Sequence, residues 1–260
     1  MRIWALPPLV LLVLTGCVTQ PVPPDRPVAP FKPFVLDPRA LARRLASIQP
    51  GWPRSRKFDC ARVKCVALTF DDGPGRYTGK LLDLLRKRDV RATFFVVGQM
   101  VAEDRGGRIT RRIADEGHEL GNHSWSHPSL PGLSHEQLEH QLRRTESIVL
   151  RLTGIRMRMM RPPYGATDEK VAAEARREGL AQIMWNVDTL DWRDRVASVV
   201  AKRAGRATPG SIVLLHDIHA STVDAVPEIL DTLGKKGFTF VTVSELYGRR
   251  PEPGRMYTER

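Results

Sequence analysis

Two histidines and two neighbouring aspartates are the residues of this sequence whose types and spacing could perform metal chemistry. His123 and His127 stand at positions i and i+4, so one helical turn would direct both imidazoles at one point. Asp71 and Asp72 are adjacent, and neighbouring residues that leave a strand point in different directions. One carboxylate could therefore complete a site of two histidines and one carboxylate, while the other faces the reacting water as a base.

Three further side chains suit roles around such a site. His216 is a candidate general acid, and Asp191 and Arg161 are candidates for orienting and tuning the acid and the base. All of these residues belong to polar clusters that follow apolar runs, namely residues 69–74, 123–127, 161–164, 188–192 and 214–217. In parallel α/β folds, functional groups collect at the carboxyl ends of the strands. Polar clusters at five of the predicted strand ends are difficult to explain as solvated loops.

The elements that must position these clusters alternate in type along the chain. Short apolar runs predict strands over residues 65–70, 92–97, 119–121, 157–160, 183–187, 212–215 and 238–243. Amphipathic segments between them predict helices over residues 80–87, 108–116, 136–152, 169–178, 197–204 and 223–235. Ser134 and Gln137 form a capping-box pair at the start of one helix. The pattern predicts a single α/β domain with a parallel sheet, and both an open doubly wound sheet and a closed or distorted barrel fit it.

The five clusters resemble, in order and type, the motifs of the polysaccharide deacetylase family, carbohydrate esterase family 4, over residues 66–246. The resemblance implies that Asp71 is the catalytic base and that Asp72, His123 and His127 bind the metal. Zinc is the usual metal in the family, and some members accept cobalt. The family fold is a distorted (β/α) barrel, usually of seven parallel strands, which agrees with the seven predicted here.

The same resemblance implies the roles of the remaining site residues. Arg161 would hold Asp71, and the backbone N–H of Tyr164 would contribute to the oxyanion site. Asp191 would orient His216 as the general acid. The side chains that would shape the pocket for the acetyl group are Trp192 and Leu214.

These assignments predict a metal-dependent hydrolase that removes N-acetyl groups from cell-wall polysaccharide, with peptidoglycan N-acetylglucosamine as the first candidate substrate. Chitin-type oligosaccharides and acetylxylan are alternative substrates of the family. An inactive carbohydrate-binding pseudo-enzyme would normally have lost a ligand, the base or the acid, and here none is missing. A non-haem iron oxygenase would share the metal-binding triad, but oxygen chemistry does not need a base and an acid pair.

The N-terminal segment predicts export. Residues 1–17 combine one positive charge, an apolar run and small residues, as a secretory signal does. The ending Leu14-Thr15-Gly16-Cys17 resembles a bacterial lipobox, in which Cys17 is lipidated; the alternative is an ordinary cleaved signal. We therefore expect a membrane-anchored protein facing the cell wall. Residues 18–58 then form a basic, Pro-rich linker, 59–248 the catalytic domain and 249–260 a basic tail.

Charge and cysteine content are consistent with this location. The formal net charge is +12, but residues 66–248 contain 26 basic and 24 acidic side chains, so the basic excess lies in the flanks. A nucleic-acid-binding domain would need a basic stripe of its own, so we expect no nucleic-acid partner. Cys60 and Cys65 remain as an even pair that could form a disulfide, although Cys65 could instead be a buried strand residue. We expect a monomer.

Overall fold

The structure is a computed structural model, and it describes residues 56–260. The predicted signal segment, Cys17 and nearly all of the predicted linker therefore lie outside the described residues. Cys60 and Cys65 are joined by a disulfide bond. None of the helices formed by residues 56–260 is long and apolar enough to cross a membrane.

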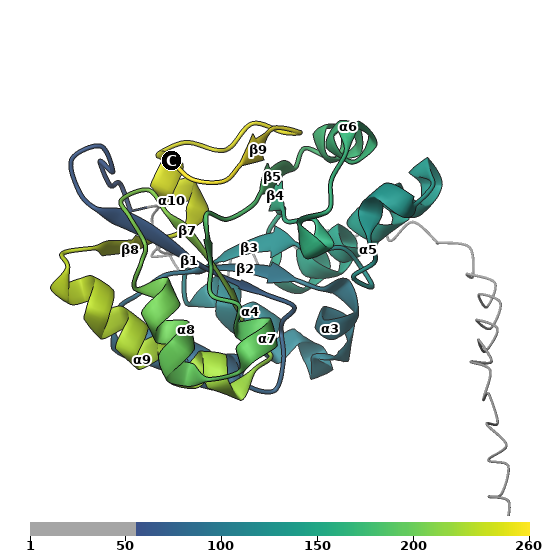
Figure 1. Ribbon diagram of the computed structural model, residues 1–260. Coiled ribbons are helices and arrows are strands. Elements are labelled where there is room, and N and C mark those ends of the chain that lie inside the picture. The colour runs from purple at the N-terminus through teal and green to yellow at the C-terminus, as the bar shows by residue number, and fades with distance from the viewer. Residues whose placement is uncertain (1–55) are drawn as a thin grey trace, which may run out of the picture. The chain divides into compact units, whose positions relative to one another are not determined.

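A parallel sheet forms the centre of the domain, in the order β6-β7-β1-β2-β3-β4-β5-β9, with β8 paired to β1 (Figure 1). Every pairing between these strands is parallel. The strands are β1 (Cys65–Asp71), β2 (Thr93–Val96), β3 (Glu119–Asn122), β4 (Met159–Met160), β5 (Ala181–Ile183), β6 (Val187–Asp188), β7 (Ile212–His216), β8 (Thr239–Val241) and β9 (Met256–Tyr257). The predicted parallel α/β architecture is confirmed.

Helices connect the strands and cover the outer face of the sheet. They are α2 (Thr78–Lys87), α3 (Gly98–Glu103), α4 (Arg108–Asp115), α5 (His135–Thr153), α6 (Glu169–Arg177), α7 (Asp191–Asp194), α8 (Ala197–Ala204), α9 (Ala220–Lys235) and α10 (Val243–Tyr247). The predicted capping box is present in α5, where the Ser134 side chain accepts a hydrogen bond from the Gln137 N–H. Gly154, at φ 72°, ends the same helix in the left-handed conformation that glycine adopts without steric cost. Short helices α3, α7 and α10 were not predicted, because they are too short to show a helical period.

One predicted strand, residues 183–187, is in fact two strands, one at an end of the sheet order and the other next to the opposite end. β5 lies beside β4, whereas β6 lies beside β7. Only residues 184–186 separate β5 from β6, and four residue steps span at most about 14 Å. The two ends of the sheet must therefore approach each other, and the sheet curls into the distorted barrel that the family resemblance implies.

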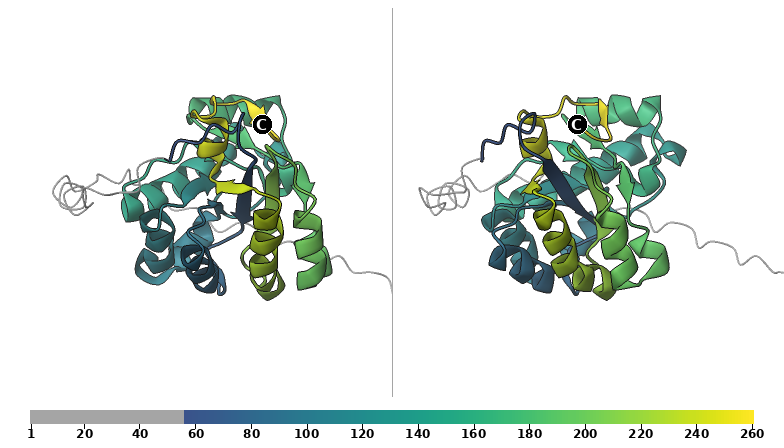
Figure 2. Two further views of the ribbon diagram at one scale, coloured as in Figure 1. Left: turned by 90° about the vertical axis from the view of Figure 1, so that its left-hand side faces the viewer. Right: turned by 60° about the vertical axis from the view of Figure 1, so that its left-hand side comes forward.

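The strands divide their side chains between two apolar clusters. In β1, Val66, Leu68 and Phe70 are fully buried in the large cluster between sheet and helices. Cys65 and Ala67 alternate with them and belong to a smaller cluster on the concave side. Thr69 and Asp71 continue that concave face as polar residues, so the inside of the barrel changes from apolar to polar towards the carboxyl ends of the strands. Both views of Figure 2 show most helices outside the curled sheet, whereas Val243 and Leu246 of α10 belong to the smaller cluster.

The C-terminal segment, predicted as a basic tail, contributes to the sheet. Strand β9 pairs with β5, and Glu259 forms an isolated antiparallel bridge with Ser211. The Arg260 N–H also donates to the Gly210 carbonyl at 3.0 Å. The chain end therefore lies against the domain, near β9 and α10 (Figure 1).

Candidate metal and catalytic site

The ends of neighbouring strands bring the predicted site residues together. Asp71, the last residue of β1, pairs in register with His216, the last residue of β7. On the other side, Asn122 at the end of β3 pairs with Met160 at the end of β4. His123 and Arg161 directly follow these two positions. Parallel pairing therefore places clusters from distant parts of the chain at one edge of the sheet.

Asp72, His123 and His127 form a set of three metal-ligand atoms within 4.8 Å of one another. The His123 Nε2 and His127 Nε2 atoms are 3.2 Å apart, and Asp72 Oδ1 lies 3.4 Å from the first and 3.3 Å from the second. Ligand atoms about 2.0–2.1 Å from a tetrahedral zinc ion are about 3.3–3.4 Å apart. Asp72 Oδ1 is also buried and has no hydrogen-bond partner among the described residues. The donor set therefore fits a divalent metal ion.

The backbone positions this triad differently from the prediction. Residues 123–127 form a loop and not a helical turn, so a tight bend of the chain brings the two imidazoles together. Asp72, Ser124 and His127 have φ values of 73°, 66° and 59°, in the left-handed region that non-glycine residues rarely adopt. Such conformations persist only where the surrounding structure imposes them, and they cluster at functional sites.

The hydrogen bonds and pKa values of the triad favour the protonation states that bind a cation. His123 Nδ1 lies 2.7 Å from the Arg161 carbonyl oxygen and donates to it, which leaves the Nε2 lone pair free for a metal. Burial would raise the pKa of Asp72, but the interactions with His123, His216 and His127 outweigh it, and the pKa falls to about 2. Burial lowers the pKa of His127, which favours the neutral imidazole that binds metals.

Asp71 lies beside the triad and is held by Arg161. The Arg161 Nη1–H donates to Asp71 Oδ1 at 2.8 Å, and Asp71 Oδ2 faces His123 Nε2 at 3.7 Å. Arg161 is completely buried and fixed by three more hydrogen bonds, to Thr69 Oγ1 and to the carbonyls of Ile183 and Met184. The guanidinium thus orients one oxygen of Asp71 and leaves the other beside the metal-ligand atoms.

His216 is held by Asp191, which is fully buried at the start of α7. His216 Nδ1 lies 2.8 Å from Asp191 Oδ1, and the Thr222 hydroxyl donates to Asp191 Oδ2 at 2.7 Å. Burial alone would lower the pKa of His216, but the hydrogen bond and charge of Asp191, with the charges of Asp71 and Asp72, raise it to about 9. The imidazole is therefore protonated at neutral pH.

Three residues predicted to contact substrate surround this centre. Tyr164 is 72% exposed, has φ 60°, and its ring packs edge-on against His127 at 4.6 Å. Trp192 is 47% exposed at the start of α7. Leu214 is buried, and the alternation along β7 puts it on the same face as His216. All three lie on segments that border the metal-ligand set or His216.

Two further residues support the site, Thr222 and Asp217, and the sequence pattern assigned a role to neither. Thr222 lies six residues after His216 on α9, and no local pattern indicated its contact with Asp191. Asp217 is completely buried, accepts a hydrogen bond from Thr78, and leaves no room for a side chain at Gly73, where a Cβ would lie 2.6 Å from its carboxylate. Burial raises the pKa of Asp217 to about 7. It braces the turn that follows Asp72.

Comparison with known proteins gives the family. Residues 59–183 match the family model of the polysaccharide deacetylases. The peptidoglycan-N-acetylglucosamine deacetylase PgdA of Listeria monocytogenes is 43% identical over 199 residues, which are 76% of this chain and 42% of that protein. A peptidoglycan-N-acetylglucosamine deacetylase of Bacillus cereus is 38% identical over 188 residues, 70% of this chain and 68% of that protein.

A solved structure extends the comparison to the fold. The structure of T48 deacetylase with substrate superposes with a TM-score of 0.73 and 40% sequence identity, and the match covers 77% of this chain and 99% of that one. The present chain spans less than half the length of the Listeria relative. Identity at this level over about two thirds of the Bacillus cereus protein shows that this chain belongs to the polysaccharide deacetylase family.

Proposed function

We propose that this protein is a metal-dependent hydrolase that removes N-acetyl groups from cell-wall polysaccharide, with peptidoglycan N-acetylglucosamine as its substrate. The observation that carries the proposal is the proximity of three groups of residues. They are the triad of Asp72, His123 and His127, the hydrogen-bonded pair of Asp71 and Arg161, and the hydrogen-bonded pair of His216 and Asp191. Similarity to relatives named as peptidoglycan-N-acetylglucosamine deacetylases supports the choice of substrate.

The reaction needs a base on one side of the acetyl carbon and an acid on the other. A divalent metal held by Asp72, His123 and His127, zinc in our proposal, would polarise the acetyl carbonyl and make water a better nucleophile. Asp71 Oδ2 faces this set, so Asp71 accepts the proton of the attacking water. The backbone N–H of Tyr164 then donates to the oxyanion that forms.

His216 completes the reaction by donating a proton. An amine leaves an acyl carbon poorly unless its nitrogen is protonated as the bond breaks. His216 is protonated at neutral pH, because Asp191 raises its pKa to about 9, and its ring is 12% exposed. Nδ1 is engaged by Asp191, so Nε2 is the atom that donates the proton to the leaving nitrogen.

Export and a lipid anchor at Cys17 are part of the same proposal. A peptidoglycan deacetylase must reach the outer face of the membrane, and residues 1–17 have the composition of a lipoprotein signal. The Pro-rich linker would then hold a monomeric catalytic domain away from the membrane surface.

Acetate release tests the proposal directly. The purified protein is loaded with zinc and incubated in parallel with peptidoglycan, chitin oligosaccharides and acetylxylan. We expect the parent to release acetate from peptidoglycan with the highest kcat/KM of the three substrates. The Asp71→Asn variant removes the base at nearly constant shape, so its kcat/KM should be lower by a factor of about 100 or more. Acetate from acetylxylan alone would assign a different substrate. Binding without acetate from any of the three would identify a pseudo-enzyme.

A further inference from the structure

A cavity of about 810 Å³ lies at the end of the sheet opposite the metal-ligand set. It is lined by residues that precede strands, among them Arg91 before β2, Glu119 at the start of β3 and Arg158 before β4. His123 follows the other end of β3, so about 13 Å of strand separates it from Glu119. The cavity is therefore separate from the proposed deacetylase site, and its function does not depend on that proposal.

The lining of this cavity is strongly basic. It includes seven cationic and two anionic side chains, which are Arg56, Lys57, Arg91, Arg156, Arg158, Arg249, Arg250, Glu119 and Glu245. The described residues as a whole contain 34 basic and 27 acidic side chains. This cavity therefore gathers a net charge of +5 out of the +7 of residues 56–260. The preceding residues 18–55 contain six basic and two acidic side chains, so this segment is itself basic and would not neutralise the charge of the cavity.

The two carboxylates of the cavity are already satisfied. Glu245 forms ion pairs with Arg56 at 3.2 Å and Arg91 at 3.4 Å, and also accepts from the Thr242 N–H at 2.9 Å. Glu119 accepts hydrogen bonds from the N–H and the hydroxyl of Ser244. These contacts fix the wall formed by α10, and they leave no acidic group of the lining for the other cations.

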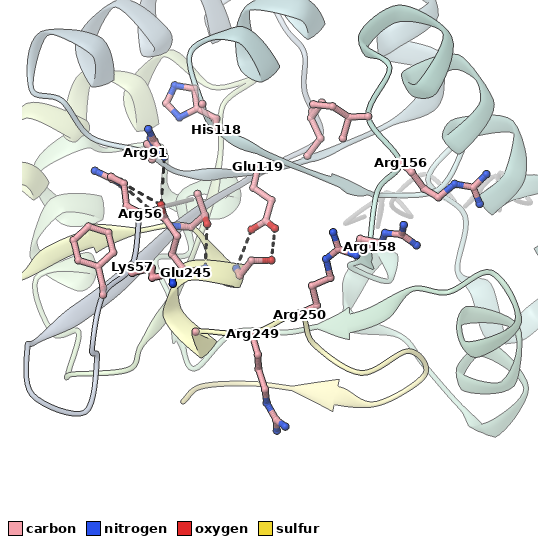
Figure 3. A pocket seen from close by; sticks show the side chains of 17 residues that line it. Arg56, Lys57, Arg91, His118, Glu119, Arg156, Arg158, Glu245, Arg249 and Arg250 are labelled. Atoms are coloured by element: carbon pink, nitrogen blue, oxygen red, sulfur yellow. Dashed lines mark hydrogen bonds and ion pairs between the residues drawn. The ribbon is translucent and has the colours of Figure 1, made fainter. Parts of the chain in front are cut away.

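Four cations consequently lack a partner for a direct contact. Among residues 56–260, no hydrogen bond or ion pair involves the side chains of Lys57, Arg156, Arg158 and Arg250. Glu146 interacts electrostatically with Arg156 and Arg158, but burial raises the pKa of Glu146 to about 7, so it is only partly charged at neutral pH. In the view of Figure 3, the side chain of Arg250 extends towards Arg158, whereas those of Arg156 and Arg249 point away from the cavity centre. Arg158 and Arg250 therefore line the same cavity without an anionic partner among residues 56–260.

A buried hydrogen-bond donor without a partner also belongs to the lining of this cavity. His118 is 5% exposed and lines the cavity. Its Nδ1 accepts a hydrogen bond from the Ala92 N–H at 3.1 Å, so the hydrogen of the neutral ring is on Nε2. Burial and the neighbouring arginines lower the pKa of His118 to about 3, which keeps the ring neutral. Nε2 has no hydrogen-bond partner among the described residues. A buried donor without a partner is costly, and this one lies on the Arg91 side of the cavity, apart from Arg158 and Arg250 (Figure 3).

We propose that this cavity binds a phosphate group, with Arg158 and Arg250 as its principal contacts. Guanidinium groups bind phosphate oxygens through paired hydrogen bonds, and a phosphate carries enough charge and acceptors to engage two arginines at once. The phosphate belongs either to the headgroup of an anionic phospholipid or to a free or esterified phosphate in solution. Both sources present the same oxygens to the site.

Calorimetric titration of the full chain with inorganic phosphate, at constant ionic strength, tests the site. We expect saturable binding that weakens at least tenfold in Arg158→Gln/Arg250→Gln. The matched control Arg105→Gln/Arg108→Gln removes two exposed arginines elsewhere and should stay within twofold of the parent. Arg158→Lys/Arg250→Lys keeps the charge but loses the planar fork, so it should fall between the two. Thermal unfolding verifies that all variants are folded.

Vesicles then identify the source of the phosphate. The site binds a lipid headgroup if the parent sediments with phosphatidylglycerol vesicles and two changes reduce this sedimentation. These changes are the double substitution Arg158→Gln/Arg250→Gln and the addition of free phosphate. Phosphate binding with equal sedimentation of parent and variant assigns it to phosphate in solution; phosphatidylcholine vesicles provide the neutral reference. The proposal is overturned if the parent shows no saturable binding of phosphate, or if the folded glutamine variant binds it as tightly as the parent does. Neither measurement requires deacetylase activity, so the two proposals fail separately.

Discussion

Asp191 accepts two hydrogen bonds from a single residue, His216. The Nδ1–H of the imidazole donates to Oδ1 at 2.8 Å, and the backbone N–H of the same residue donates to Oδ2 at 2.7 Å. The carboxylate therefore fixes both the position of the strand end and the rotation of the ring. These contacts in turn lower the pKa of Asp191 although burial opposes the shift, so Asp191 stays ionised opposite the protonated imidazole.

The Asp191→Asn variant should move the alkaline limit of activity to lower pH. His216 acts when protonated, so activity is present below its pKa and is lost as the pH rises through it, near 9 in the parent. Removal of the carboxylate charge should bring this pKa back towards the ordinary value of about 6.5. Profiles of kcat against pH should show the shift and a reduced maximum. An unchanged alkaline limb would mean that Asp191 does not tune the acid.

The His216→Ala variant should lose turnover but keep its metal. A general acid contributes about 10²–10⁴-fold, and His216 is not among the three ligand residues. Activity should recover on an activated acetyl ester, whose leaving group departs without a proton. Metal content and both rates are measured on the same preparation. Loss of metal from this variant would contradict the assignment of His216 as an acid.

Alanine at Asp72, His123 or His127 should reduce metal content and abolish deacetylation while the domain stays folded. Each side chain supplies one of the three ligand atoms, and two remaining ligands hold a divalent ion weakly. The matched control is His135→Ala, which removes an exposed imidazole at the start of α5. Elemental analysis after dialysis gives the stoichiometry. Full metal occupancy in His123→Ala would show that the triad is not the site.

The Arg161→Lys variant should lower both stability and activity without releasing the metal. A lysine keeps the positive charge but cannot reproduce the four hydrogen bonds of the buried guanidinium, and a buried acceptor left without its donor costs about 1–3 kcal/mol. His123 contacts the main-chain carbonyl of residue 161, so the metal ligand keeps its orientation. Denaturant unfolding, metal content and kcat together separate these effects. Stability equal to that of the parent would refute the structural role of the guanidinium.

The Cys17→Ser variant should release the protein from the membrane fraction. Cys17 lies outside the described residues, and no helix of residues 56–260 could span a membrane. One lipid chain binds only marginally, so basic side chains near the domain would assist the anchor. Those of the flank are Arg39, Arg43, Arg44, Arg54, Arg56 and Lys57. Fractionation of cells producing each form measures the partition, and unchanged membrane association would contradict the lipobox interpretation.

The sequence by itself determined most elements and the chemical types of the site. Strong local signals, such as the Ser134 cap and the glycine at position 154, define α5 to within one residue of its prediction. The candidate metal ligands and the candidate acid were identifiable because unusual polar groups follow apolar runs. Their assignment to roles came from the family resemblance, and their proximity is visible only in the pairing of β1 with β7.

Only the tertiary structure decided features that depend on partners distant in the chain. The split of residues 183–187 between two ends of the sheet follows from barrel closure, which no local period encodes. The i, i+4 spacing of His123 and His127 predicted a helical turn, but the chain forms a bend with left-handed backbone at Ser124 and His127. Arg158 and Arg250 are 92 positions apart in the sequence, and only folding brings them to one cavity. Local propensity acts between neighbours in sequence, whereas burial and strand pairing act between neighbours in space, and the second kind of contact assembles the site.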